Sequence, residues 1–292
     1  MTPAVAEIHR LWGIVLAGTL DERQQHRAAA RSVGEDRSRC QHALFRQTIE
    51  RASWLIPAER LVAVVARDHS AYYDRELLRD LGPIHTVVQP AWRGSAAGLF
   101  LPILKITSAD PDATVAVFPG GQPVDGHAQL MTSVAKAVHA VAVRPELPVV
   151  IGAVPRGPDV GQAWIEPGSA IEGLEAYAVR AVRRFVPRPT RSEATSLWEG
   201  DGLVNTHVII AKARALITLG ARYLPDVLET FEPLGAAFGT PEEPLLCEAV
   251  YEDMPYASVA HALFVRARDV AVLPAPHVRT RIESPAVHAL AS

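Results

Sequence analysis

The sequence predicts an α/β fold with a mostly parallel, mixed sheet flanked by helices. Short apolar runs rich in β-branched residues alternate with longer segments whose apolar residues recur at helical spacing. The runs carry no charged residues, which is typical of strands that helices cover on both faces. Sheets of this kind bind ligands at the carboxyl ends of their strands.

Five apolar runs have the length and composition of strands. They span residues 13–17, 61–66, 85–89, 113–118 and 148–152. Between them, residues 42–55 and 128–143 place most of their apolar side chains on one face of a helix. Further strands are expected at 163–165, 177–185 and 203–210, with helices from residue 211 onward. Because no internal repeat or long linker divides the chain, we expect one domain over 1–292, with halves meeting near residue 150.

Composition excludes several classes of protein. Of the 292 residues, 49% are hydrophobic and 21% charged, so the chain can bury a core. The formal net charge of -3 predicts no general attraction to nucleic acid or to an anionic membrane. Two distant thiols, Cys40 and Cys247, indicate a reduced, cytoplasmic protein without a disulfide framework. We expect neither a signal peptide nor a membrane span.

The turn after the first strand begins like a phosphate-binding loop and then departs from one. Residues 13–18 (GIVLAG) end in small residues, after which further glycines would let backbone N–H groups approach an anion. Thr19, Asp21 and Glu22 follow instead. Their side chains hinder a close approach, and the two carboxylates repel a phosphate.

Generic catalytic motifs are absent from the sequence. It contains no G-x-G-x-x-G, Walker A, G-x-S-x-G or H-E-x-x-H pattern. His69 follows a strand and is either a ligand or base, or more simply a loop histidine. The acidic stretch 242–253 is interpreted as a solvated helix face rather than a metal site.

The order of segments resembles that of the sugar nucleotidyltransferases, above all the bacterial mannose-1-phosphate guanylyltransferases. The segments that carry the resemblance are IVLAG (14–18), DRSRCQHALF (36–45), QPAWRGSAAGLFLPILKI (89–106), DPDATVAVFPGGQPVDG (110–126), GAVPRGPDVGQAWIEPG (152–168), VRRFVPRPT (182–190) and LVNTHVIIAKARAL (203–216). The resemblance implies a Rossmann-like fold of the nucleotide-diphospho-sugar transferase type. It places the nucleotide on the first half of the chain and the sugar on the second.

The resemblance also implies an activity and its site residues. An NTP and a sugar 1-phosphate would give an NDP-sugar and pyrophosphate with Mg²⁺, GTP and GDP-mannose being the expected nucleotides. The resemblance is also compatible with a homo-oligomer or a hetero-oligomer. The implied roles are nucleotide binding for Ala17, Gly18, Arg93 and Gly94, catalysis for Arg23 and Arg39, and sugar binding for Arg188 and Asn205.

The sequence departs from the family pattern where chemistry is expected. The aspartate that holds the metal corresponds to Gly121, and the C-terminal stretch 277–285 contains Glu283 as its one acid. The glutamate of the family's F-x-E-K-P segment has no counterpart in 185–189. Asp112, Asp125 and Glu283 are therefore weak candidates for metal ligands.

Three functions follow as hypotheses. The chain is a nucleotidyltransferase with weak or altered activity, or a non-catalytic relative that binds a sugar nucleotide or regulates an active paralogue. An unrelated Rossmann oxidoreductase is disfavoured, because the glycine fingerprint and its ribose-binding acid are both missing from the sequence.

Overall fold

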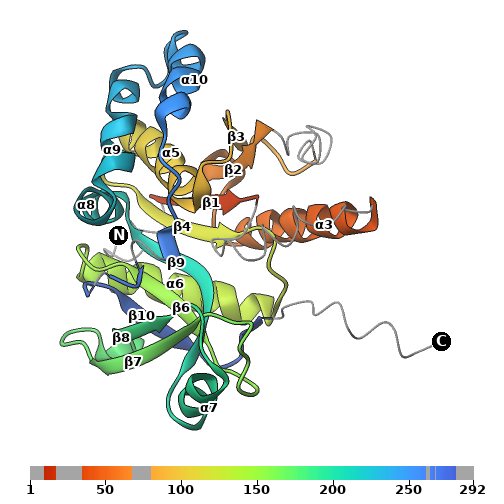
Figure 1. The fold of residues 1–292 in the computed structure, drawn as a ribbon, viewed down its shortest axis with the longest axis vertical. Helices are drawn as coiled ribbons and strands as arrows, with labels where there is room; N and C mark the ends of the chain where they lie inside the picture. Colours follow the sequence, from red (N-terminus) through yellow and green to blue (C-terminus); the bar gives the residue numbers. More distant parts are fainter. Residues whose placement is uncertain (1–9, 18–34, 68–79, 261–263, 267, 281–292) are drawn as a thin grey trace.

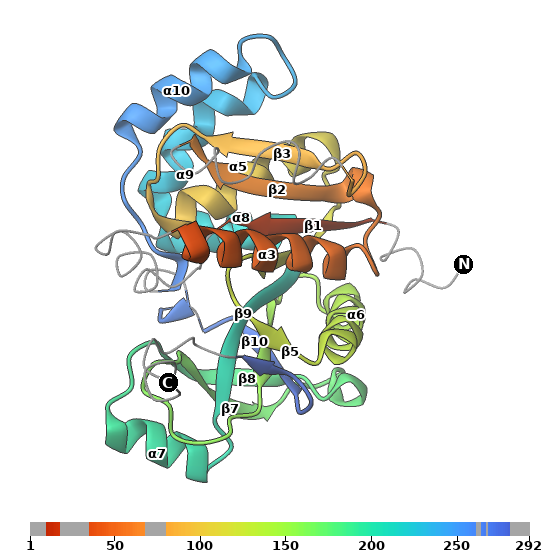
Figure 2. The same ribbon diagram turned by 90° about the vertical axis from the view of Figure 1, so that its right-hand side faces the viewer.

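The computed structural model describes residues 10–17, 35–67, 80–260, 264–266 and 268–280, and the structural statements below concern these residues. A nine-stranded mixed sheet lies between two layers of helices (Figure 1, Figure 2). The strands follow the order β3-β2-β1-β4-β9-β6-β10-β8-β7 across the sheet. The predicted fold class is confirmed.

The first half of the chain forms the parallel part of the sheet. Its strands are β1 (Leu11–Leu16), β2 (Leu61–Ala66), β3 (His85–Gln89) and β4 (Thr114–Pro119). β1 is an interior strand, paired in parallel with β2 on one side and β4 on the other, and β3 forms the sheet edge. The four predicted strands are confirmed, with small shifts at their ends.

The second half adds strands in both directions. They are β6 (Val149–Ala153), β7 (Trp164–Ala170), β8 (Arg180–Val186), β9 (Leu203–Lys212) and β10 (Ala271–Ala275). β9 runs antiparallel between β4 and β6 and so joins the two halves in one sheet. The sequence did not predict β10, because AVLPA is short and contains a proline, which is unfavourable in an interior strand. Parallel pairing with β6 places this strand.

Helices cover both faces of the sheet. They are α3 (Glu35–Ala52), α5 (Gly94–Ala109), α6 (His127–Val143), α7 (Arg191–Glu199), α8 (Ala213–Tyr223), α9 (Pro225–Phe231) and α10 (Glu243–Asp253). α3 and α6 pack on one face, whereas α5, α8, α9 and α10 form the layer on the other (Figure 2). α3 and α6 confirm the helices predicted at 42–55 and 128–143, and α10 confirms the helix expected from the acidic stretch. α5 has no single apolar face, because it is buried along most of its length, and it contains Pro102. It therefore lacks the helical periodicity that predicted α3 and α6.

Successive side chains of a strand point to opposite faces of the sheet, so the hydrophobic core has two parts. Ile14 belongs to the core under α5 and α8, whereas its neighbour Val15 belongs to the core under α3 and α6. Val117 and Phe118 of β4 divide in the same way. β1, β2 and β4 are predominantly apolar because both of their faces are covered.

A separate two-stranded sheet joins β5 (Val124–Asp125) to β11 (Arg279–Thr280). Among the described helices, none combines the length and the apolar character needed to cross a bilayer.

Candidate functional site

β1 and β4 are neighbouring parallel strands, and their carboxyl ends lie side by side at one edge of the sheet. The N–H of Ala17 donates to the carbonyl of Val64 over 2.8 Å, and the N–H of Gly120 donates to the carbonyl of Leu16 over 2.8 Å. A Cβ on Gly120 would lie 2.4 Å from the ring of Phe45, so this close approach of backbones requires glycine. In sheets of this type, ligands bind at such a switch point.

A narrow cavity opens beside this point, at the carboxyl ends of β1, β2 and β3. It is lined by Leu16, Ala17, Val64, Gln89, Trp92, Ser95 and Gly98. Its volume of about 10 Å³ corresponds to roughly one water molecule, and we call its lining residues the cavity floor. Ala17, predicted to bind nucleotide, is part of this floor.

One residue that lines this cavity, Gln89, is hydrogen-bonded to Tyr251, and the sequence singled out neither of them. Gln89, 2% exposed, accepts a hydrogen bond at Oε1 from the hydroxyl of Tyr251 over 3.3 Å. Burial raises the pKa of the Tyr251 phenol, so its proton stays in place. Strand alternation could have found Gln89, since Val88 before it faces solvent. No local signal identifies Tyr251, which belongs to α10.

The Arg93–Gly94 pair lies at the start of α5. Gly94 has a φ of 85°, and a Cβ there would lie 2.3 Å from the carbonyl oxygen of Ala257, so the turn requires glycine. The Arg93 guanidinium donates to the backbone carbonyls of Tyr251 and Glu252, over 3.0 and 3.3 Å. Its hydrogen bonds therefore run to the end of α10, beside the cavity floor.

The predicted sugar-binding residues, Arg188 and Asn205, come just after residues of β8 and β9 that pair with the same residue of β7. Trp164 pairs with Val186 on one side and with Val204 on the other. Arg188 is exposed in the turn that follows Val186, and Asn205 follows Val204. The register of three strands thus brings these two predicted residues to one end of β7.

Asn205 is buried and shapes its own strand. Its Oδ1 accepts a hydrogen bond from the N–H of His207 over 2.8 Å, and Asn205 pairs with Gly152 near the carboxyl end of β6. His207 has a φ of 58°, a left-handed conformation that residues other than glycine seldom adopt. The asparagine side chain stabilises this bend at the same edge as the cavity.

Sequence and structure comparisons agree on the relatives of this chain. No family model matches it. A mannose-1-phosphate guanylyltransferase of Escherichia coli is 24% identical over 226 residues, which cover 74% of this chain and 47% of that protein. A mannose-1-phosphate guanylyltransferase of Klebsiella pneumoniae gives the same values. The chain is similar in sequence to these sugar nucleotidyltransferases.

Solved structures show that the chain has the nucleotide-diphospho-sugar transferase fold of that family. The crystal structure of a mannose-1-phosphate geranyltransferase from Thermus thermophilus superposes with a TM-score of 0.75 at 22% identity, over 93% of this chain and 76% of that one. A mannose-6-phosphate isomerase from Helicobacter pylori superposes with a TM-score of 0.67 at 14% identity, over 92% and 99%. This chain spans about half the length of the curated relatives it matches.

One of the three predicted metal candidates, Asp125, lies where two described segments of the chain meet. Asp125 on β5 pairs with Arg279 on β11. A Cβ on Gly126 would lie 2.3 Å from the carbonyl oxygen of His277, so the 277–280 segment packs directly on this turn. Glu283 follows the same segment but lies outside the described residues.

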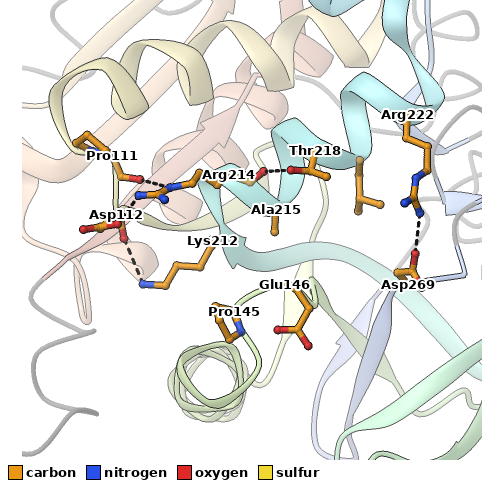
Figure 3. A pocket seen from close by; sticks show the side chains of 11 residues that line it. Pro111, Asp112, Pro145, Glu146, Lys212, Arg214, Ala215, Thr218, Arg222 and Asp269 are labelled. Carbon is orange, nitrogen blue, oxygen red and sulfur yellow. Dashed lines mark hydrogen bonds and ion pairs between the residues drawn. The ribbon is translucent and has the colours of Figure 1, made fainter.

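Asp112 lies elsewhere, just before β4 and therefore at the opposite edge of the sheet. Figure 3 shows it in the wall of a cavity of about 470 Å³, near Lys212 and Arg214. Its carboxylate accepts hydrogen bonds from Arg10 over 3.2 Å and from Arg214 over 2.5 Å. The structure therefore does not bring Asp112 together with Asp125, and two guanidinium groups already balance its charge.

Several predictions concern residues that the structure leaves undescribed. Gly18, Arg23 and His69, and the Thr19–Glu22 departure from a phosphate loop, lie outside the described residues. Arg39 lies on α3, but its side chain is not among those described. Across the part of the chain with described side chains, no three His, Cys, Asp or Glu residues cluster as a metal site would require.

Proposed function

We propose that this chain binds a nucleoside triphosphate and a sugar 1-phosphate at the carboxyl edge of its sheet, as a mannose-1-phosphate guanylyltransferase-like protein with weak or lost turnover. One arrangement carries the proposal. The cavity lies in the first half of the sheet, at the carboxyl ends of β1 to β3. Arg188 and Asn205 lie in the second half, at the end of β7 that begins with Trp164. The switch point between β1 and β4 separates the two places. This layout suits a substrate pair with a base at one end and a sugar at the other.

The reaction joins two anions. An oxygen of the sugar phosphate attacks the α-phosphorus of GTP, and the bond to pyrophosphate breaks as the new P–O bond forms. Little covalent chemistry is required of the protein, which must align the reactants and offset their charge. In this proposal Arg23 and Arg39 would face the triphosphate, and Arg188 would face the sugar phosphate.

Mg²⁺ would supply further neutralisation between the phosphates when bound. Asp125 has the hard oxygen ligands that Mg²⁺ prefers, and with Glu283 it would hold the ion together with phosphate oxygens. Gly121, which follows the end of β4, offers only its backbone carbonyl. We attribute weak turnover to this small donor set and to Asp21 in the first loop, which repels the triphosphate.

A second candidate function is binding without catalysis, as a regulatory relative of an active enzyme. The glycine at position 121 favours it, because it removes a carboxylate without altering the neighbouring Gly120 contact that shapes the site. Binding of GDP-mannose requires neither in-line attack nor a bridging metal ion, so this role would survive the loss of acids.

Calorimetric titration with GTP, GDP-mannose and mannose 1-phosphate, with and without Mg²⁺, tests the proposal. A parallel assay for pyrophosphate release separates the two candidates. We expect saturable binding of GTP or GDP-mannose and a low rate of pyrophosphate release. Failure of all three ligands to bind would refute both functions, and rapid release that EDTA abolishes would refute the loss of turnover.

A further inference from the structure

A cavity of about 470 Å³ lies at the amino end of β4, at the edge of the sheet opposite the proposed substrate site (Figure 3). Asp112, just before β4, lines it, and so does Lys212, the last residue of β9, which pairs with the first residue of β4. Pro145 and Glu146, which follow α6, line the side across from Ala215 of α8 (Figure 3). The volume is in the range of small-molecule sites, about 300–1,000 Å³.

Positive charge gathers in this cavity where α8 begins. Lys212 is the N-cap residue of α8, Arg214 belongs to its first turn, and both line the cavity. The first turn of α8 contains no acidic residue, and the N-cap side chain forms no hydrogen bond with the helix. Backbone N–H groups at a helix N-terminus carry partial positive charge, so cations beside them are unfavourable unless an anion offsets them. This end of the cavity therefore suits an anion.

The carboxylates in the cavity walls are already neutralised by arginines. Glu146 accepts a hydrogen bond from Arg144 over 2.6 Å, and Asp269 accepts one from Arg222 over 3.0 Å. The carboxylate of Asp112 accepts from two arginines. The charged side chains described at the cavity therefore carry a net positive charge, although three acids line it.

The rest of the cavity suits a ligand body that carries hydroxyl groups. Pro145 and Leu219 supply apolar surface. The carboxylates of Glu146 and Asp269 can accept hydrogen bonds from hydroxyl groups and keep their arginines, because each carboxylate has about four lone-pair sites. Arg222, which pairs with Asp269, lies about two helical turns beyond the start of α8, so the polar groups are spread along the cavity.

We propose that this cavity is a second ligand site, which binds a phosphate monoester with a hydroxylated body, such as a phosphorylated sugar. The phosphate would lie at the start of α8, against the Lys212 amine and the Arg214 guanidinium, and the body would extend toward Glu146 and Asp269. β4 separates this site from the proposed substrate site by its six residues, roughly 20 Å. The inference therefore stands independently of the proposed function.

Calorimetry on the full chain with glucose 6-phosphate, inorganic phosphate and glucose tests the site. We expect glucose 6-phosphate to bind saturably, inorganic phosphate to bind more weakly and glucose not to bind. Lys212→Gln and Arg214→Gln should each weaken binding of glucose 6-phosphate roughly tenfold, the scale of one hydrogen bond to a charged group. Arg191→Gln is the matched control and should keep the wild-type affinity, because it removes the same charge from the start of α7.

Thr218→Glu gives a second reading that keeps every ion pair of the cavity. Thr218 is exposed and lines the cavity, so the new carboxylate would repel a phosphate there. We expect it to abolish binding of glucose 6-phosphate and to leave the affinity for GTP unchanged.

Two results would overturn the inference. One is the absence of saturable glucose 6-phosphate binding to the wild type, and the other is an affinity that none of the three cavity variants changes. Binding of glucose 6-phosphate that these variants weaken, in a protein that does not bind GTP, would refute the proposed function and support this site.

Discussion

The guanidinium of Arg93 donates from Nε to the backbone carbonyl of Tyr251 over 3.0 Å, joining segments 158 residues apart. Carbonyls in the last turn of a helix lack partners within the helix, and a cation there also complements the helix dipole. Arg93 thus holds α10 beside the cavity that Gln89 and Ala17 line. The family resemblance implies that Arg93 binds nucleotide. In the structure its hydrogen bonds hold α10, the helix beside the cavity.

Arg93→Ala should destabilise the protein by about 1–2 kcal/mol, because two carbonyls lose a charged donor. Nucleotide affinity should fall several-fold as α10 is released from the cavity. Urea unfolding and calorimetry measure the two effects. Arg222→Ala, which breaks an exposed pair with Asp269, is the control and should alter neither by much. Unchanged nucleotide affinity in Arg93→Ala would show that Arg93 has no role in the site.

Gly98→Ala should weaken nucleotide binding with little loss of stability. The new methyl group would lie 3.2 Å from Gln89 Nε2 and displace the amide, whereas alanine favours the helix by about 1 kcal/mol. Gly235→Ala is the matched control, since a Cβ there meets nothing within 4 Å. Affinity and thermal unfolding of both variants check the prediction. Equal nucleotide affinities for the two variants would contradict it.

A double change, Gly121→Asp with Asp21→Gly, should raise the rate of pyrophosphate release. The first substitution adds a carboxylate for Mg²⁺, and the second removes a charge that repels the triphosphate. The release of pyrophosphate from GTP and mannose 1-phosphate is the measurement. If the unmodified protein already turns over rapidly and EDTA stops it, then Asp125 or Glu283 holds the metal and the site is intact.

Stability should decrease at alkaline pH through Cys247. Burial, followed by the nearby charges of Glu248 and Glu243, raises the pKa of this thiol from 9.0 to about 11. The folded state therefore holds the proton more tightly than the unfolded chain. The contribution is complete below pH 9 and is lost as the pH rises toward about 11.

Urea unfolding of the wild type at pH 8 and at pH 10.5 measures this loss. Cys247→Ala should lose less stability over the same interval, because it has no thiol to titrate. The raised pKa of Tyr251 adds a loss of the same sign at higher pH, and Tyr251→Phe removes it. An identical fall in the wild type and Cys247→Ala would exclude the thiol as the source.

Three strands of the parallel half, β1, β2 and β4, were predictable because their burial leaves a direct trace in the sequence. β2 is buried at all six positions and reads LVAVVA without a polar residue. β10 leaves no comparable trace, since Pro274 interrupts a short run, and pairing with β6 is what makes it a strand. A continuous apolar run predicts an interior strand where that strand is buried on both faces, as β2 is.

The candidate site was predictable in part. Ala17, Arg93 and Asn205 lie at or beside the carboxyl edge of the sheet, and their binding roles remain predictions. Asp112 lies at the opposite edge, because it precedes β4 and so lies at the amino end of that strand. Gly18, Arg23 and Glu283 remain predictions, since they lie outside the described residues.

The sequence by itself determined the layer architecture, because apolar runs and helical periodicity record which surfaces must avoid water. It also carried the family resemblance, which depends on the order of short segments. Only the tertiary structure decided that the Tyr251 hydroxyl donates to Gln89 and that Arg93 donates to the carbonyls of α10. The physical reason is that hydrogen bonds between distant segments depend on distance and direction after folding, and neither has a local signature in the chain.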